Sequence, residues 1–209
     1  MAQAAVAKGF TVRQDIVATR IDRKLMDRLI SFTGGLMALA LVALGAAAIY
    51  GGSFALSNVG DRLAPQNIVF PPAEAMSDYD KAAGLTAFAG HKVDTGTEAE
   101  AFSRYIGGHL ADVNDGKSYA ETSSESRAYA AQVGEDPTAA EAATMGELSG
   151  KVDTLFKGET LRGMLLNAYG WGTVGQITLW AGFGMVAIGL LLAVFAALGF
   201  HHARKIQHP

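Results

Sequence analysis

The sequence predicts an all-α membrane protein: two antiparallel transmembrane helices with an α-helical extracytoplasmic domain between them. Of the 209 residues, 50% are hydrophobic and only 18% are charged, which is more apolar than an ordinary soluble domain. The stretches 29–60 and 163–203 contain no Asp, Glu, Lys or Arg. Because a bilayer core of about 30 Å needs about 20 apolar helical residues, each stretch is long enough to cross it.

Buried helices of a soluble protein and a cleaved signal peptide fit these stretches less well than membrane spans do. Core helices of soluble proteins rarely stay uncharged for about 18 residues or more. A cleaved signal peptide has an apolar region of about 7–15 residues, whereas the first stretch is far longer and begins only after residue 28. We therefore predict two retained transmembrane helices, over residues 29–56 and 171–200.

Residues 1–28 predict a cytoplasmic amphipathic helix. Apolar residues recur at steps near four from Val12 to Leu29, and Arg and Asp residues fill the other face. Such a helix could lie on the inner leaflet or bind a cytoplasmic partner. The simplest interpretation is that it extends the first transmembrane helix into the cytoplasm.

The distribution of charge predicts the topology. Lys and Arg residues flank the cytoplasmic ends of membrane helices, and they are present in segment 1–28 and in the tail 201–209. We therefore expect a multi-pass protein of the plasma membrane with both termini in the cytoplasm. The segment 57–170, with 17 acidic against 9 basic residues, is then extracytoplasmic. The short basic ends suit an anionic lipid surface, and we predict no nucleic-acid partner.

Aromatic and basic residues near the ends of both predicted spans indicate where the lipid interface lies. Tyr50 stands toward the outer end of the first span, and Tyr169 and Trp171 stand at the start of the second. Arg162 is the last charged residue before the second span. Tyr and Trp rings favour the headgroup level, so we predict that these four residues anchor the helices at the outer interface.

Small residues four positions apart predict the surfaces on which the spans pack. They form one row in each span: Ala43, Ala47 and Gly51 in the first, and Gly189, Ala193 and Ala197 in the second. Such rows allow helices to approach closely. The simplest use is packing of the two spans against each other, and a second use is packing against other subunits.

The segment between the spans predicts a set of helices. Prolines make residues 57–93 irregular, with at most one short extended piece. A helix follows that begins at Thr95 or Thr97, because either threonine can form a capping box with the Glu three residues later. A Ser-rich helix is expected over residues 119–132. Pro137 fits the first turn of a last helix, which can run on into the second span.

Two His-x-x-Asp pairs in the outer segment are the candidates for metal binding: His91 with Asp94, and His109 with Asp112. Imidazole and carboxylate groups ligate Zn²⁺ and other divalent ions. Nothing in the sequence brings the two pairs together, so we predict no metal site. The alternative for His109 is that its ring stacks on Tyr105 and hydrogen-bonds Asp112 or water.

The sequence offers no catalytic motif. It has no cysteine, which excludes a thiolate metal site, a thiol nucleophile and a disulfide framework. The serines at 123, 124 and 126 lack the Gly-x-Ser-x-Gly surroundings of a nucleophile, and phosphate- and dinucleotide-binding loops are missing as well. Ion and proton pathways usually need a charged group within the spans, and there is none. We therefore predict neither an enzyme nor a bound cofactor.

The stretches HLADVNDGKSYAE and TLFKGETLRGMLLNAYGWGTVGQI lie in the outer segment and at the start of the second span. They resemble an uncharacterised family of two-span membrane proteins of high-GC bacteria, mainly actinobacteria. The resemblance implies two spans around an extracytoplasmic helical segment, and it implies no activity and no site residues. The longer amphipathic N-terminus departs from the shortest members of that family.

These observations favour a non-catalytic integral membrane protein that acts as an accessory or structural subunit of a membrane assembly. Its expected partners are membrane lipid and other membrane-protein subunits, or further copies of itself. Two alternatives remain open: an extracytoplasmic ligand or metal sensor, and a homo-oligomeric pore.

Overall fold

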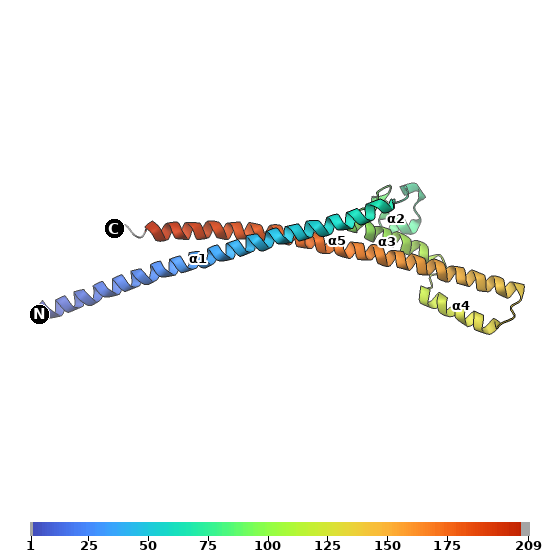
Figure 1. Cartoon of the computed structure of the whole chain (residues 1–209), viewed down its shortest axis with the longest axis horizontal. Helices are drawn as coiled ribbons and strands as arrows, with labels where there is room; N and C mark the ends of the chain where they lie inside the picture. Colours follow the sequence, from blue (N-terminus) through green and yellow to red (C-terminus); the bar gives the residue numbers. More distant parts are fainter. Residues whose placement is uncertain (1, 206–209) are drawn as a thin grey trace. The chain divides into compact units, whose positions relative to one another are not determined.

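The computed structural model describes residues 2–205, and the side chains of residues 25–205. Every regular element in this part of the chain is a helix, and the two longest are α1 and α5 (Figure 1). The elements in chain order are α1 (Ala2–Leu63), η1 (Ala64–Gln66), η2 (Ala73–Ala75), α2 (Asp78–Ala82), η3 (Leu85–Phe88), α3 (Gly96–Ala111), α4 (Tyr119–Val133) and α5 (Ala139–Lys205). The one extended pairing within residues 2–205 is an isolated bridge between Val69 and Lys92. The all-α prediction is therefore confirmed.

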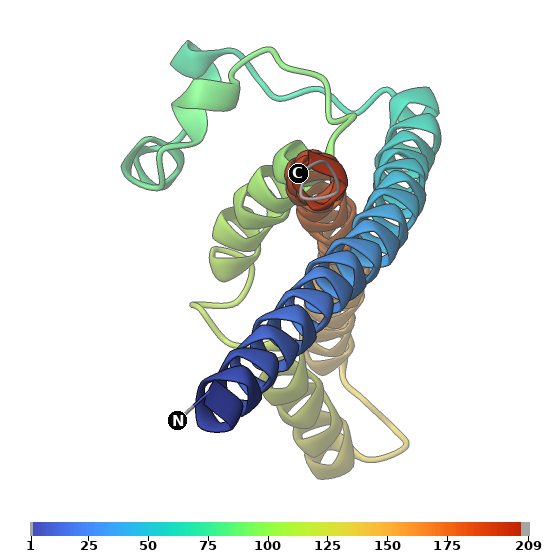
Figure 2. The same ribbon diagram turned by 90° about the vertical axis from the view of Figure 1, so that its left-hand side faces the viewer.

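Two helical stretches are long and apolar enough to cross a membrane: Leu25–Gln66 and Ala139–Lys205. Only 11% of the most apolar window of each is buried inside the structure, whereas the core helix of a soluble protein would be mostly buried. Helix α1 is one continuous ribbon (Figure 2), and α5 is likewise a single helix from Ala139 to Lys205. The prediction of two membrane-length apolar helices is therefore confirmed. The amphipathic face proposed for residues 12–24 lies outside the described side chains.

The chain divides into two compact units. The terminal unit combines Met1–Gly51 with Thr178–Pro209, and the central unit is Gly52–Ile177. Each unit therefore contains one part of α1 and one part of α5. Helix α1 continues through residue 28, where the cytoplasmic helix was predicted to give way to the first span.

In the terminal unit, α1 and α5 pack through small residues that recur every seven positions. The buried positions are Ser31, Ala38 and Gly45 on α1, and Gly182, Gly189, Ala196 and Ala203 on α5. A seven-residue step returns to nearly the same helix face after two turns. Gly189 lies against Ala38 and Val42, and Gly182 lies against Gly45 and Ile49. Along this seam, residues with higher sequence numbers on α1 therefore contact residues with lower sequence numbers on α5.

The central unit has a hydrophobic core of its own. It is built from the C-terminal end of α1, the segment between α1 and α3, α3 itself and α5. Its buried members are Val59, Leu63, Phe70, Met76, Leu85, Val93, Ala99, Ala101 and Leu165. The ring of Phe70 lies 5.5 Å from that of Phe88 and 5.0 Å from that of Phe102. The prediction that residues 57–93 are irregular is wrong in part, because α1 continues to Leu63, before Pro65, and α2 lies within this range. The segment after α1 buries Phe70 and Leu85, so it is part of the packed unit.

Capping boxes begin the helices of the central unit. In α3, the Thr95 hydroxyl accepts a hydrogen bond from the Glu98 amide, and the Glu98 carboxylate accepts one from the Thr95 amide. The prediction of Thr95 as one of two possible starts is therefore confirmed. Thr138 and Glu141 form the same pair before α5. The prediction that Pro137 lies in the first turn of that helix is wrong, because Thr138 caps it and the helix begins at Ala139.

Candidate functional site

The His and Asp residues considered for metal binding do not converge. The Nδ1 atom of His91 lies 3.7 Å from Oε1 of Glu98, and Nε2 of His109 lies 3.8 Å from Oδ2 of Asp80. The carboxylates of Asp94 and Asp112 belong to exposed residues on either end of α3. Among the described side chains, no group of three or more His, Cys, Asp or Glu residues could hold a metal ion. Each histidine therefore faces an acid outside its predicted His-x-x-Asp pair.

His109 and Asp80 form the most enclosed acid–imidazole pair of the central unit. Asp80 is 1% exposed, and its Oδ2 atom accepts hydrogen bonds from the amide and hydroxyl of Ser77 at the start of α2. The His109 ring lies 4.5 Å from the Tyr105 ring in an edge-on arrangement. The predicted contact of His109 with Tyr105 is therefore confirmed, although the rings meet edge-on rather than stacked and the acid neighbour is Asp80 rather than Asp112. The first role of Asp80 is to cap α2.

Glu98 joins the start of α3 to the loop before it. Its carboxylate accepts hydrogen bonds from the backbone amides of Asp94 and Thr95 and from the Thr95 hydroxyl. Burial raises the pKa of the Glu98 carboxyl, but these three hydrogen bonds outweigh burial and the net pKa is lowered from its ordinary value. The ionised form of Glu98 is therefore the form that the fold stabilises.

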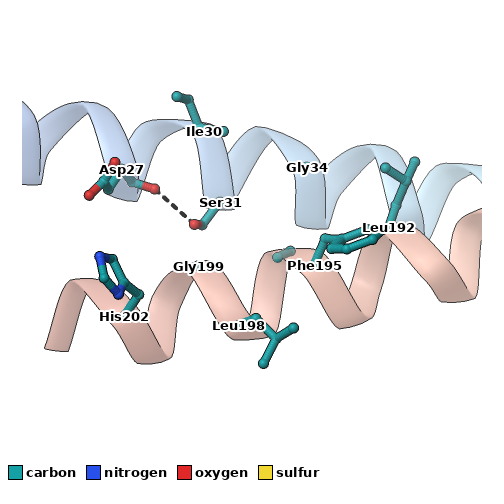
Figure 3. A pocket seen from close by; sticks show the side chains of 10 residues that line it. Asp27, Ile30, Ser31, Gly34, Leu192, Phe195, Leu198, Gly199 and His202 are labelled. Carbon is teal, nitrogen blue, oxygen red and sulfur yellow. Dashed lines mark hydrogen bonds between the residues drawn. The ribbon is translucent and has the colours of Figure 1, made fainter. Parts of the chain in front are cut away.

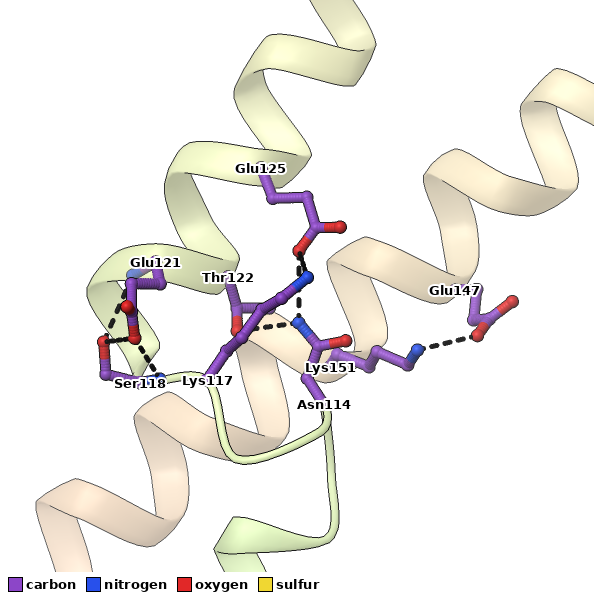
Figure 4. A network of polar contacts seen from close by, with 8 residues as sticks. All are labelled: Asn114, Lys117, Ser118, Glu121, Thr122, Glu125, Glu147 and Lys151. Carbon is purple, nitrogen blue, oxygen red and sulfur yellow. Dashed lines mark hydrogen bonds and ion pairs between the residues drawn. The ribbon is translucent and has the colours of Figure 1, made fainter.

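A polar network connects the turn after α3 to α4 (Figure 4). Asn114 and Thr122 are both buried, and the Asn114 amide donates hydrogen bonds to the Thr122 hydroxyl at 3.0 Å and to Glu125 at 3.3 Å. The Lys117 ammonium reaches the same Glu125 oxygen at 2.8 Å. The hydrogen bond from Lys117 is the largest cause that lowers the pKa of Glu125. These hydrogen bonds therefore hold the turn between α3 and α4 in a fixed position against α4.

Lys151 forms an ion pair within α5, near this network. Its ammonium lies 2.9 Å from Oε1 of Glu147. This hydrogen bond to Glu147 raises the pKa of Lys151, and the charges of Asp115 and Glu125 contribute in the same direction. Figure 4 shows three neighbouring sets of contacts: Ser118 with Glu121, Asn114 and Lys117 with Thr122 and Glu125, and Lys151 with Glu147. The arrangement thus has the character of a structural clamp, with no unpaired nucleophile or acid–base couple among its described members.

Arg162 packs on α3 within the central unit. Its guanidinium donates hydrogen bonds to the carbonyl of Ser103 at 3.2 Å and to Glu159 at 2.7 Å. A Cβ atom at Gly107 would lie 3.0 Å from the Arg162 guanidinium carbon. Gly107, which sequence propensity marks only as a weak point of the helix, therefore makes room for this side chain. The Arg162 guanidinium thus finds its partners within the central unit. Its role as an interfacial anchor stays a prediction.

The three predicted aromatic anchors are exposed. Tyr50 lies in the terminal unit, and Tyr169 and Trp171 lie in the central unit, all on long apolar helices. Amphipathic rings that face outward from such helices suit the headgroup region of a bilayer. Their role as interfacial anchors stays a prediction.

The predicted rows of small residues coincide only partly with the observed seam. Gly189 is buried in it. The other members face outward: Ala43, Ala47, Gly51, Ala193 and Ala197. Residues four positions apart lie along one ridge of a helix. The contacts between α1 and α5 instead recur every seven residues, the spacing that keeps the same helix face toward a closely packed partner. The seven-residue repeat of small residues at Ser31, Ala38 and Gly45 would have identified the contact face of α1. A search for small residues four positions apart does not find it.

A pocket of about 420 Å³ opens between α1 and α5 within the terminal unit (Figure 3). One end is polar, with Asp27 and Ser31 on α1 and His202 on α5. Leu192 and Phe195 lie at the other end (Figure 3), and the remaining residues that line the pocket are Ile30, Gly34, Ala196, Leu198 and Gly199. The Ser31 hydroxyl donates a hydrogen bond to the Asp27 carbonyl at 2.8 Å. The sequence patterns did not predict this pocket.

No protein-family model, curated protein or solved structure matches the chain. The resemblance to a two-span actinobacterial family therefore stays a prediction. What the molecule does is accordingly inferred from its exposed apolar helices, its small-residue seam and its pocket.

Proposed function

We propose that this protein is a non-catalytic integral membrane protein that serves as an accessory or structural subunit of a membrane assembly. Its two long helices cross the bacterial inner membrane in opposite directions, with both termini in the cytoplasm. Residues 57–170 lie on the extracytoplasmic side and form the larger part of the surface offered to other subunits.

The observation that carries the proposal is the inverted distribution of residue size in the terminal unit. Small residues lie inside, at the seam between α1 and α5, while large apolar side chains lie outside. Leu39 is 72% exposed and Phe195 is 67% exposed. In water this surface would be a large apolar patch of the kind that soluble monomers avoid. In a bilayer the same surface faces lipid tails, and close contact of small residues is what holds membrane helices together.

The contact order along the seam supports helices that cross in opposite directions. Gly189 contacts Ala38, whereas Gly182 contacts Gly45. Two helices that contact each other in this order run in opposite directions. The N-terminal end of α1 and the C-terminal end of α5 then lie on the same side of a bilayer. Both ends are rich in Lys and Arg, which favours the cytoplasmic side.

The role as a subunit is supported by surfaces that the chain leaves open. The row Ala43, Ala47 and Gly51 is exposed on α1 and is free of α5. Small residues at this spacing admit a further helix at short distance. The central unit adds an exposed aromatic pair, Tyr119 and Phe156, with ring centroids 5.7 Å apart. These surfaces fit lateral contacts with other membrane-protein subunits or with further copies of the chain.

The proposal is tested by native purification of the tagged full-length protein from gently solubilised membranes, followed by mass spectrometry and a native gel. We expect the protein to remain in membranes after a carbonate wash. We also expect other subunits to co-purify with it at a constant molar ratio. Substitution of Ala47→Leu should reduce that ratio, and Gly184→Leu, at another open position of the terminal unit, serves as the control. Recovery as a strict monomer would contradict the subunit role. Recovery as a homo-oligomer would favour the sensor or the pore.

A further inference from the structure

We propose that the pocket of the terminal unit binds a membrane lipid that carries a primary ammonium in its headgroup, of the phosphatidylethanolamine type. The ammonium pairs with the carboxylate of Asp27, the phosphodiester lies at His202, and an acyl chain follows Phe195 and Leu192. This inference rests on the proposed membrane location of α1 and α5.

The polar end of the pocket has the charge of an ammonium site. Asp27 is the only charged residue among the described residues that line it. Asp27 and His202 come from different helices and lie at the same end of the pocket (Figure 3). An ammonium with three N–H donors can form charge-assisted hydrogen bonds to the carboxylate. An imidazole N–H of His202 can donate to the phosphate oxygen that follows the ammonium in such a headgroup.

The position of Asp27 gives this pairing its strength. The uncharged stretch of α1 begins only two residues later, at Leu29. A carboxylate at the edge of hydrocarbon is poorly solvated, and it gains more from a paired cation than it would in water. A lipid can supply that cation at the required depth, because its ammonium and its acyl chains belong to one molecule.

The apolar walls have the length and the composition of an acyl-chain groove. From His202 to Leu192 the pocket follows α5 for about 15 Å, at a rise of about 1.5 Å per residue. Phe195 and Leu198 are more than half exposed although they line the pocket. The groove is therefore open to the side, as lateral entry from a bilayer requires. The volume of about 420 Å³ lies within the range of small-ligand pockets, about 300–1,000 Å³.

Small residues make the space that the lipid would fill. A Cβ atom at Gly199 would displace the Ser31 hydroxyl from its present position, whereas it would lie at an ordinary contact distance of 3.4 Å from the Ser31 Cβ atom. At Gly34 a Cβ atom would lie 3.9 Å from Cβ of Ala196, which is ordinary contact. A larger side chain at Gly34 can therefore enter the pocket while its own Cβ is tolerated. This makes Gly34→Leu a pocket-filling variant.

The test is native mass spectrometry of the full-length protein, released from micelles to which one defined lipid has been added. Phosphatidylethanolamine is compared with phosphatidylcholine and phosphatidylglycerol of the same acyl chains. Choline keeps the positive charge but has no N–H donor, and glycerol has no positive charge. We expect about ten-fold more bound phosphatidylethanolamine than either of the others, which is the size of effect that a charge-assisted hydrogen bond gives.

Two variants and two matched controls locate the site. Asp27→Asn should reduce the preference to about parity, and Gly34→Leu should abolish retention of all three lipids. Asp61→Asn makes the same chemical change in the central unit, and Gly184→Leu adds the same side chain where nothing lies within 4 Å. Both controls should bind lipid as the unchanged protein does.

Three results would overturn the inference. They are equal retention of the three lipids by the unchanged protein, tighter binding of phosphatidylglycerol, and an unchanged preference after Asp27→Asn. Failure of the proposed function is seen separately, because a protein removed from membranes by carbonate is not integral. A protein that resists carbonate but shows no preference for phosphatidylethanolamine contradicts the lipid site alone.

Discussion

Gly45 and Gly182 face each other so closely that a methyl group on either one would lie 2.8 Å from the carbonyl oxygen of the other. Both contacts involve backbone atoms, which cannot move aside as the end of a side chain can. The pair therefore sets the distance between α1 and α5 at this point of the terminal unit.

Replacing Gly45 with alanine should separate the two helices. Gly45→Ala and Gly182→Ala are each expected to destabilise the protein by about 1–3 kcal/mol, the usual cost of overpacking. The readout is the thermal unfolding midpoint of the full-length protein in mild detergent, followed by circular dichroism.

The controls for this seam are two glycines of the same unit with open space around them. Gly51→Ala and Gly184→Ala meet nothing within 4 Å, and alanine gains up to about 1 kcal/mol over glycine in a helix. They should leave the midpoint unchanged or raise it. If all four variants behave alike, the seam of small residues is not the contact between the helices.

A second close approach lies in the central unit, between Gly96 at the start of α3 and Gly172 on α5. A Cβ atom at Gly96 would lie 3.2 Å from the Cα atom of Gly172 and 3.3 Å from the Ala168 carbonyl oxygen. Gly96→Ala should therefore lower the unfolding midpoint, at a cost of about 1 kcal/mol or more. Gly170→Ala, which has open space, is the control. An unchanged midpoint for Gly96→Ala would show that α3 does not pack on α5 there.

The buried hydrogen bond from Asn114 to Thr122 predicts a cost for losing the hydroxyl. Thr122→Val keeps the shape of the side chain but removes one acceptor of the Asn114 amide, which should cost about 1–3 kcal/mol. Thr154→Val removes an exposed hydroxyl that bonds only to the preceding turn, and it should be nearly neutral. The free energy of unfolding in denaturant separates the two. Equal effects would contradict the clamp function of the network.

Acid should loosen the central unit because the fold lowers the pKa values of several carboxyl groups. Hydrogen bonds at helix starts lower the pKa values of Glu98, Glu121 and Glu141 from their ordinary value in the folded chain. A group whose folded pKa is lowered stabilises the fold above its unfolded pKa, and this contribution is lost as the pH falls through the folded value. The unfolding midpoint should therefore decrease as the pH falls below about 4.5.

Glu98→Gln tests the part of this acid sensitivity that belongs to α3. The amide keeps the size of the side chain but loses the charge, so the variant should be less stable at neutral pH by about 1 kcal/mol, the usual value of a helix cap. Its midpoint should then change less with acid than that of the unchanged protein. A variant with full stability at neutral pH and the same acid response would contradict the assigned role.

Sequence patterns predicted the helices better than they predicted the contacts between them. The Thr95 capping box follows from a local rule, and the structure confirms it. The contact between His109 and Asp80 does not follow from a local rule. Asp80 is distant in sequence and reaches His109 only because α2 folds back on α3, where the Tyr79 ring lies on Gly108. No local pattern contains that information.

The seam in the terminal unit could have been found from the sequence, but only with the right period. Steps of four and steps of seven both connect small residues on these helices, since glycine and alanine are frequent throughout. The choice depends on how the two helices wind around each other, which is a property of the pair. The pocket beside Asp27 could not be predicted from local patterns, because its walls come from two helices that are distant in sequence.

The central claim, that the chain crosses the membrane twice with its middle segment outside, is tested most directly by labelling single cysteines. The sequence contains no cysteine, so Ser124→Cys and His201→Cys each introduce one exposed thiol. An impermeant maleimide is added to intact cells and, separately, to lysed cells. We expect that Ser124→Cys is labelled in intact cells and His201→Cys only after lysis. Labelling of both in intact cells, or of His201→Cys alone, would contradict the two-span topology.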